Sequence, residues 1–137
     1  MTRRARLLRA LSRCYPLKSG LGTLASSRPF LRALDGEQGL HWARLRCGAQ
    51  ILVPLDDFVG RALWFFGDLD PKLTWICERL LRPGDTVLDI GANLGLVSLI
   101  ARERVGASGA VHAFEPQPEL VELIGQSARA NGFDDIV

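Results

Sequence analysis

The chain has 137 residues and a hydrophobic fraction of 47%, which suffices for the core of one ordinary domain and excludes a disordered chain. Its net charge of +2 is unevenly placed, because residues 1–34 carry eight basic residues and no acid, while residues 35–137 carry nine basic residues and all 15 acids. No stretch approaches the roughly 18 consecutive apolar residues of a membrane-spanning helix.

Residues 1–13 place leucines at helical spacing among arginines, which predicts a short basic helix. Arginines interrupt every apolar run there, which argues against a secretory signal, although the composition overlaps with that of organelle transit peptides. Residues 16–29 are rich in Gly, Pro and Ser, as linkers are. We therefore expect a solvated basic extension and linker over residues 1–34. Peripheral contact with an anionic membrane is an alternative. Nucleic-acid contact is not expected, because no aromatic residue is interleaved with the arginines before Tyr15.

The next segment predicts a small β-hairpin. Alternation over 41–46 and the apolar run 50–54 flank a Cys-Gly-Ala turn, which is typical of two antiparallel strands. An apolar, aromatic run over 61–66 follows and stops at Gly67.

A helix is predicted from Pro71, with Asp70 as its N-cap. Apolar residues at helical spacing form one face of this helix, namely Leu73, Ile76, Cys77, Leu80 and Leu81. A Pro-Gly-Asp turn then leads to the most informative stretch of the chain.

From residue 86 the pattern alternates between strand and helix: strand 86–89, helix 95–104, strand 110–114, helix 118–131, and the approach to a third strand at 134–137. This is the βαβ pattern of a parallel sheet with right-handed crossovers. The fold class is therefore α/β, a partial Rossmann-like domain with flanking helices, preceded by the hairpin and helical region. The first strand is short and apolar, which predicts cover on both faces. Gly132 suits a left-handed helix cap.

The junction after the first strand carries the candidate site. Gly91 permits a sharp turn at the strand end, and Gly95 is expected to let the new helix pack closely against the sheet. Backbone N–H groups at the start of that helix would then favour an anionic or strongly polar ligand. Glu115 ends the next strand, about 25 residues after Asp89, close to the roughly 20 expected in dinucleotide sites. A carboxylate there can accept both hydroxyl hydrogens of a ribose.

The loop departs from the dinucleotide pattern G-x-G-x-x-G, because Asn93 occupies the place of the middle glycine. Asp89 would repel a pyrophosphate but suits the amino group and sulfonium of S-adenosylmethionine. Two structural roles stay open: Asp89 as a carboxylate that caps nearby backbone N–H groups, and Asn93 as a turn residue that tolerates positive φ.

The motifs Asp89-Ile-Gly-Ala-Asn-Leu-Gly95, Phe114-Glu-Pro116 and Ala130-Asn-Gly132 make residues 55–137 resemble the FkbM family of S-adenosylmethionine-dependent methyltransferases. The resemblance implies that S-adenosylmethionine is the cofactor and that Glu115 binds its ribose hydroxyls. It also implies that the loop residues surround its methionine part, namely Asp89, Gly91, Ala92, Asn93 and Gly95. Members of the family typically methylate a hydroxyl oxygen on a secondary metabolite or a glycan. No catalytic base can be assigned.

Three segments are expected: the extension 1–34, the hairpin and helix region 35–82, and an incomplete methyltransferase domain 83–137. Two other functions stay open, a truncated non-catalytic fragment or interaction module and an NAD(P)-binding Rossmann domain. The expected partner is a small-molecule or glycan acceptor, with no nucleic acid. The widely spaced cysteines, Cys14, Cys47 and Cys77, predict reduced thiols in a cytoplasmic protein and no metal site.

Overall fold

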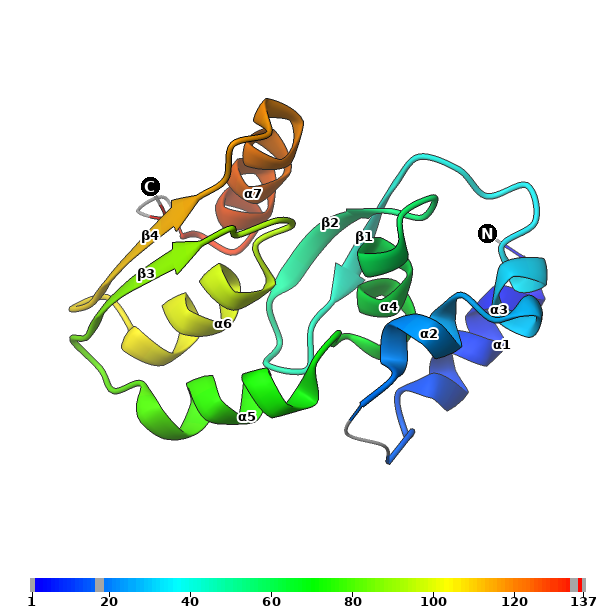
Figure 1. Ribbon diagram of the computed structural model, residues 1–137, viewed down its shortest axis with the longest axis horizontal. Coiled ribbons are helices and arrows are strands. Elements are labelled where there is room, and N and C mark those ends of the chain that lie inside the picture. Colours follow the sequence, from blue (N-terminus) through cyan, green and yellow to red (C-terminus); the bar gives the residue numbers. More distant parts are fainter. Residues whose placement is uncertain (1, 17–18, 134–135, 137) are drawn as a thin grey trace.

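The computed structural model describes residues 2–16, 19–133 and 136, and Figure 1 shows their arrangement. The elements in chain order are α1 (Arg3–Ser12), α2 (Leu21–Ala25), α3 (Arg28–Ala33), β1 (Leu40–Arg44), β2 (Gln50–Pro54), α4 (Phe58–Phe66), α5 (Pro71–Leu80), β3 (Thr86–Ile90), α6 (Leu96–Val105), β4 (Ala110–Phe114) and α7 (Pro118–Ala130). None of the helices in the described part of the chain has the length and apolar character that a membrane crossing requires.

The predicted hairpin is confirmed. Strands β1 and β2 pair antiparallel, from Leu40 opposite Pro54 to Arg44 opposite Gln50. The N–H of Leu45 donates to the carbonyl of Ala49 at 2.8 Å and closes the turn. The apolar run before Gly67 forms α4, which ends at this glycine with φ 69°.

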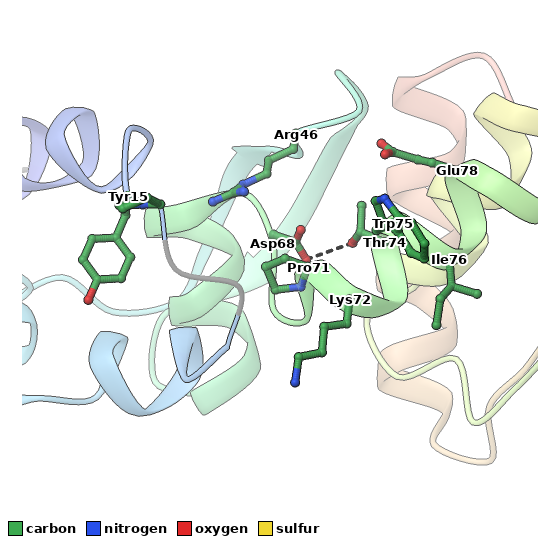
Figure 2. A pocket seen from close by; sticks show the side chains of 10 residues that line it. Tyr15, Arg46, Asp68, Pro71, Lys72, Thr74, Trp75, Ile76 and Glu78 are labelled. Atoms are coloured by element: carbon green, nitrogen blue, oxygen red, sulfur yellow. Dashed lines mark hydrogen bonds between the residues drawn. The ribbon is translucent and has the colours of Figure 1, made fainter.

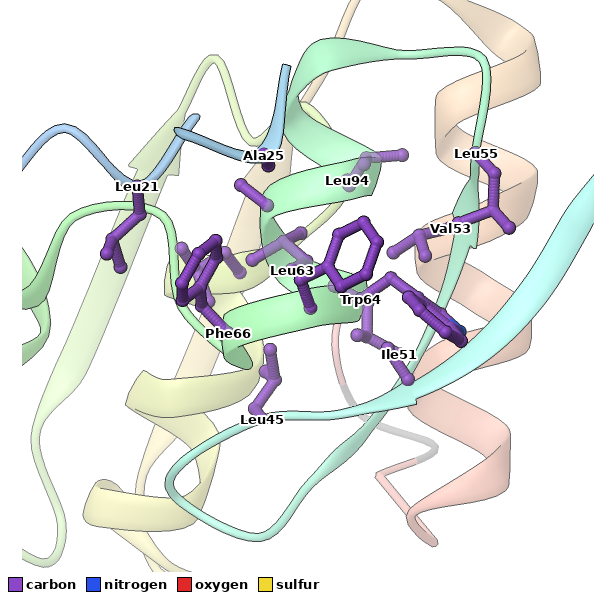
Figure 3. Close-up of a cluster of buried hydrophobic side chains, with 14 of the residues drawn as sticks. Leu21, Ala25, Leu45, Ile51, Val53, Leu55, Leu63, Trp64, Phe66 and Leu94 are labelled. Carbon is purple, nitrogen blue, oxygen red and sulfur yellow. The ribbon is translucent and has the colours of Figure 1, made fainter. Parts of the chain in front are cut away.

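Helix α4 lies at the centre of the main core (Figure 3). Its last four side chains, Leu63–Phe66, are at most 1% exposed. Leu94, from the loop after β3, is 2% exposed and belongs to the same core. This contact anchors the candidate site to the hairpin region, because the loop cannot move without exposing an apolar side chain.

The prediction of a solvated N-terminal extension is wrong. Helices α2 and α3 occupy much of the expected linker, and Leu21 and Ala25 are fully buried. Phe30 packs edge-on against Phe65, with ring centroids 4.8 Å apart. Gly22 does not serve as a flexible joint, since a Cβ there would overlap the ring of Phe58. Glycine lets α2 approach α4 at this point.

The parallel pair β3–β4 is confirmed, with Asp89 opposite Ala113. Val87 and Val111 pack with α6 on one face of this pair. The other face is open among the described residues, which contradicts the prediction that β3 is covered on both sides. Its side chains are strongly exposed: Leu88 61%, Ile90 80% and Phe114 53%. Of the predicted third strand, Ile136 forms a parallel bridge with Val111, and residues 134, 135 and 137 lie outside the described residues.

Helix α5 begins as predicted, because the Asp70 carboxylate accepts hydrogen bonds from the N–H groups of Lys72 and Leu73. Its buried residues are Thr74 and Cys77. The predicted apolar face is instead largely exposed, with Leu73 at 39%, Ile76 at 43% and Leu80 at 69%. Helix α5 packs on α6, but only Thr74 and Cys77 are buried. Helical spacing of apolar residues therefore did not identify the buried face of α5.

Side chains of α7 pair with the free edge of β2 and join the two halves of the chain. The Ser127 hydroxyl accepts from the N–H of Leu52 at 2.9 Å. The Asn131 amide accepts from the N–H of Gln50 and donates to its carbonyl, both at 2.7 Å. Gly132 follows with φ 70°, which confirms the predicted left-handed cap.

Candidate cofactor site

The loop between β3 and α6 contains three residues in the left-handed region: Gly91 at φ 83°, Asn93 at φ 51° and Gly95 at φ 84°. Asn93 is the one non-glycine residue with positive φ among the described residues, as its expected tolerance for such a turn allows. A Cβ at Gly91 would meet no atom within 4 Å. Gly91 therefore leaves open space beside the loop.

Gly95 has a different neighbour from the one predicted. A Cβ at this position would lie 3.1 Å from Cγ1 of Ile124, on α7. The close approach is thus between the loop and α7, not between α6 and the sheet. Gly95 is also the N-cap of α6 and offers no side chain to cap it.

The backbone N–H groups of the loop itself donate within the protein. The expectation of a ligand concerned the N–H groups at the start of α6, and no side chain caps that end of the helix. The N–H groups of all five residues from 91 to 95 donate within the protein. Those of Gly91 and Ala92 donate to the carbonyl of Phe114, at 2.8 and 3.0 Å, and that of Gly95 donates to the carbonyl of Ala92 at 2.7 Å. The N–H of Asn93 donates to Oε2 of Glu115 at 2.9 Å, and the N–H of Leu94 donates to Oδ1 of Asn93 at 2.8 Å. Ala92 itself is buried, with 6% exposure. The loop is therefore internally satisfied and held against the end of β4.

Glu115 lies where the sequence placed it, directly after β4 and against the loop. Its Oε2 accepts from the N–H of Asn93 at 2.9 Å, and its Oε1 accepts from the N–H of Gln117 at 3.1 Å. The side chain is half-buried. Each carboxylate oxygen can accept a second hydrogen bond, so the group is oriented and still able to bind hydroxyls.

Asp89 is 9% exposed and sits on the α6 side of β3. The hydroxyl of Ser98 donates to its Oδ2 at 2.5 Å. The partner that orients this carboxylate is thus a hydroxyl on α6. Ser98 is fully buried and was missed by the sequence reasoning. The sequence signal that could have identified Ser98 is that it is the one hydroxyl residue among the apolar residues at the start of α6.

A cavity of about 560 Å³ lies elsewhere and includes no residue of the loop. Figure 2 shows it beside the start of α5, with Arg46, Asp68 and Trp75 among its lining residues. Asp68 is 1% exposed. Its Oδ1 accepts from the Thr74 hydroxyl at 3.0 Å, and its Oδ2 has no hydrogen-bond partner among the described residues. Burial raises the pKa of Asp68 above the ordinary value for an aspartate.

The chain is similar to known methyltransferases over part of its length. It is 40% identical over 76 residues to the ribosomal protein L11 methyltransferases of Bacillus cereus (strain AH820) and Bacillus anthracis (strain A0248). The matched segment is 53% of this chain and 24% of each relative. The match thus spans about a quarter of the length of these curated relatives. No family model matches the chain.

Proposed function

We propose that this chain forms part of the cofactor site of an S-adenosylmethionine-dependent methyltransferase. The observation that carries the proposal is that all five N–H groups of residues 91–95 are already engaged. A pyrophosphate approached by the backbone of this loop needs such donors. The acidic side chains at the two strand ends are those of Asp89 and Glu115, which suit a cation and hydroxyls. An NAD(P)-binding domain is correspondingly disfavoured.

S-adenosylmethionine, when bound, supplies a methyl group activated by the sulfonium. Glu115 would accept the two ribose hydroxyl hydrogens, and Asp89 would face the positively charged methionine part. Gly91, Ala92, Asn93 and Gly95 would form the loop around it, with the open space at Gly91 on the ligand side. Methyl transfer depends largely on positioning the acceptor, and no residue of this chain is assigned as a base.

The similarity to methyltransferases supports the reaction class. The finer assignment, transfer to a hydroxyl oxygen of a secondary metabolite or glycan, rests on the resemblance to the FkbM family. A cytoplasmic location rests on the three free thiols. A non-catalytic fragment or interaction module is the alternative for the chain by itself, and it predicts cofactor binding without turnover or no binding at all.

Calorimetric titration of the full chain with S-adenosylmethionine, S-adenosylhomocysteine and NADH tests the proposal. We expect the first two ligands to bind and NADH not to compete. Preferential NADH binding would falsify the proposal. Transfer of a labelled methyl group to a mixed acceptor pool, containing hydroxylated metabolites, glycans and ribosomal protein L11, then separates catalysis from binding.

A further inference from the structure

A polar groove of about 370 Å³ lies between α1, the hairpin and the end of α7. Its lining includes Arg9, Trp42, Arg44 and Asn131 and contains no acidic residue. Its volume is within the range of about 300–1,000 Å³ of small-ligand pockets. We propose that this groove binds single-stranded nucleic acid, with phosphates on Arg9 and Arg44 and a base stacked on Trp42.

Two arginines that line the groove, Arg9 and Arg44, lie close enough to Arg13 to act on its charge, and so does Arg46, which lines the cavity beside α5. Arg13 is half-buried, and desolvation, followed by the charges of Arg9, Arg46 and Arg44, lowers its pKa to about 10. Within the part of the chain that the structure describes, none of the four forms an ion pair with an acid. The buried Asp68 interacts electrostatically with Arg46. The cluster therefore has an excess of positive charge that an anion would balance.

The guanidinium groups of Arg9 and Arg44 are each held by one contact within the protein, and N–H donors of both remain able to bind a ligand. The guanidinium carbon of Arg9 lies 4.4 Å from the ring centroid of Trp64. The Nε of Arg44 donates to the carbonyl of Gly48 at 3.1 Å. The terminal nitrogens of both groups have no hydrogen-bond partner among the described residues. A preorganised guanidinium fork is well suited to two phosphate oxygens.

Trp42 supplies the aromatic surface. It lies two residues before Arg44 on β1, so both side chains project from the same face of the strand. Trp42 is 45% exposed and lines the groove together with Arg9. The linear sequence shows no aromatic residue interleaved with the N-terminal arginines, which was the reason for expecting no nucleic acid. Folding provides that interleaving by bringing Arg9 of α1 and Trp42 of the hairpin to the same groove.

The groove favours nucleic acid over a membrane surface. A membrane would engage a projecting apolar patch flanked by cations, whereas this groove is hollow and lined mainly by polar groups. The exposed leucines of α1, Leu7 at 64% and Leu11 at 63%, line a different cavity with Arg4 and Arg32. Contact with nucleic acid and contact with a membrane therefore depend on different residues, so substitutions can distinguish them.

The test measures fluorescence anisotropy of a labelled uridine oligonucleotide of about 12 nucleotides with the full chain, at about 50 and 200 mM salt. Trp42→Ala is expected to weaken binding by about five- to 150-fold, since stacking contributes about 1–3 kcal/mol per base. Arg44→Ala should weaken binding and reduce the slope of log affinity against log salt by about 1. The matched controls are Trp75→Ala and Arg79→Ala, an exposed Trp–Arg pair on α5, which should bind like the wild type.

Inorganic polyphosphate of equal charge and vesicles of phosphatidylglycerol and phosphatidylcholine complete the design. Polyphosphate binding should be insensitive to Trp42→Ala, because it has no base to stack. Three outcomes would overturn the proposal: no oligonucleotide binding, equal losses in the Trp42 and Trp75 variants, or vesicle binding that depends on Leu7 and Leu11 in place of oligonucleotide binding. Circular dichroism melting of each variant confirms that the fold is kept.

Discussion

The carboxylate of Glu115 accepts a hydrogen bond from the backbone N–H of Asn93 at 2.9 Å, and so links the end of β4 to the loop that follows β3. Glu115→Ala removes this link together with the expected acceptor for ribose. Hydrogen bonds to charged groups contribute about 1.5–3 kcal/mol each, so affinity for S-adenosylmethionine should fall at least about tenfold. Isothermal titration calorimetry measures the loss.

The control for this substitution is Glu119→Ala. Glu119 is exposed in the first turn of α7 and forms no hydrogen bond with the loop among the described residues. It should bind the cofactor like the wild type. An unchanged dissociation constant in Glu115→Ala, with the fold intact, would place the ribose away from this strand end.

The two loop glycines allow backbone strain to be separated from steric contact. Both Gly91→Ala and Gly95→Ala put a Cβ on a left-handed backbone, which costs about 1–2 kcal/mol. Only at Gly95 does the new Cβ also meet Ile124, at 3.1 Å. Gly95→Ala should therefore lower the midpoint of urea unfolding more than Gly91→Ala. The reverse order would show that α7 does not pack on the loop as described.

The hydrogen bond from Ser98 to Asp89 allows the structural role of this carboxylate to be separated from its ligand role. Ser98→Ala leaves a buried carboxylate without its hydroxyl donor and should cost about 1.5–3 kcal/mol of stability. Asp89→Asn keeps an oxygen that can accept from Ser98 but removes the negative charge, so it should lower cofactor affinity more than stability. Thermal melting and calorimetry on the two variants check this contrast. Equal effects on both quantities in both variants would mean that Asp89 only ties β3 to α6.

Features that depend on local chemistry could be predicted from the sequence. The Asp70–Pro71 helix start, the hairpin turn and the βαβ alternation all follow from near neighbours in the chain. The sequence predicts a linker where α2 and the start of α3 lie, because Gly22 and Pro29 are typical of turns. Gly22 instead allows a close helix contact, and Pro29 stands at the start of α3, where it is tolerated.

Features of the site that depend on tertiary geometry were missed. Ser98 contacts Asp89 because α6 turns the face that carries Ser98 toward β3. The spacing of residues in the sequence does not give the rotation of α6 about its axis. The N–H groups of Gly91 and Ala92 donate to the carbonyl of Phe114 because the end of β4 lies close to the loop. This closeness depends on the packing of the two strands and not on residues near the loop in the sequence. The apolar face of α5 is a further example, because Leu73, Ile76 and Leu80 are exposed. Apolar spacing identifies one face of a helix but not whether another element covers it.

The buried Asp68 should make stability depend on pH. Burial raises its pKa in the folded state. At a pH below about 3.9, the ordinary pKa of aspartate, the carboxyl is protonated in both states and no penalty arises. As the pH rises toward and through the raised folded pKa, the unfolded chain loses its proton more readily, and stability is lost. Asp68→Asn should therefore raise the melting temperature at pH 7 and have little effect at pH 3.

The matched control is Asp35→Asn, at an exposed position, where a surface substitution should change stability by no more than about 0.5 kcal/mol. Melting curves of both variants at pH 3, 5 and 7 check the prediction. A constant difference between Asp68→Asn and the wild type across this range would show that Asp68 ionises in the folded protein as easily as in the unfolded chain.

The side chains of Ser127 and Asn131 act on β2 as a neighbouring strand would, and this sets an order of events during synthesis. Leu52 precedes its partner by 75 residues, and Gln50 precedes its partner by 81. At about 5–20 residues per second, the hairpin leaves the ribosome seconds before α7 exists. During that interval the edge of β2 can pair with any extended chain nearby. A chaperone that shields this edge would therefore be needed only until α7 has been made.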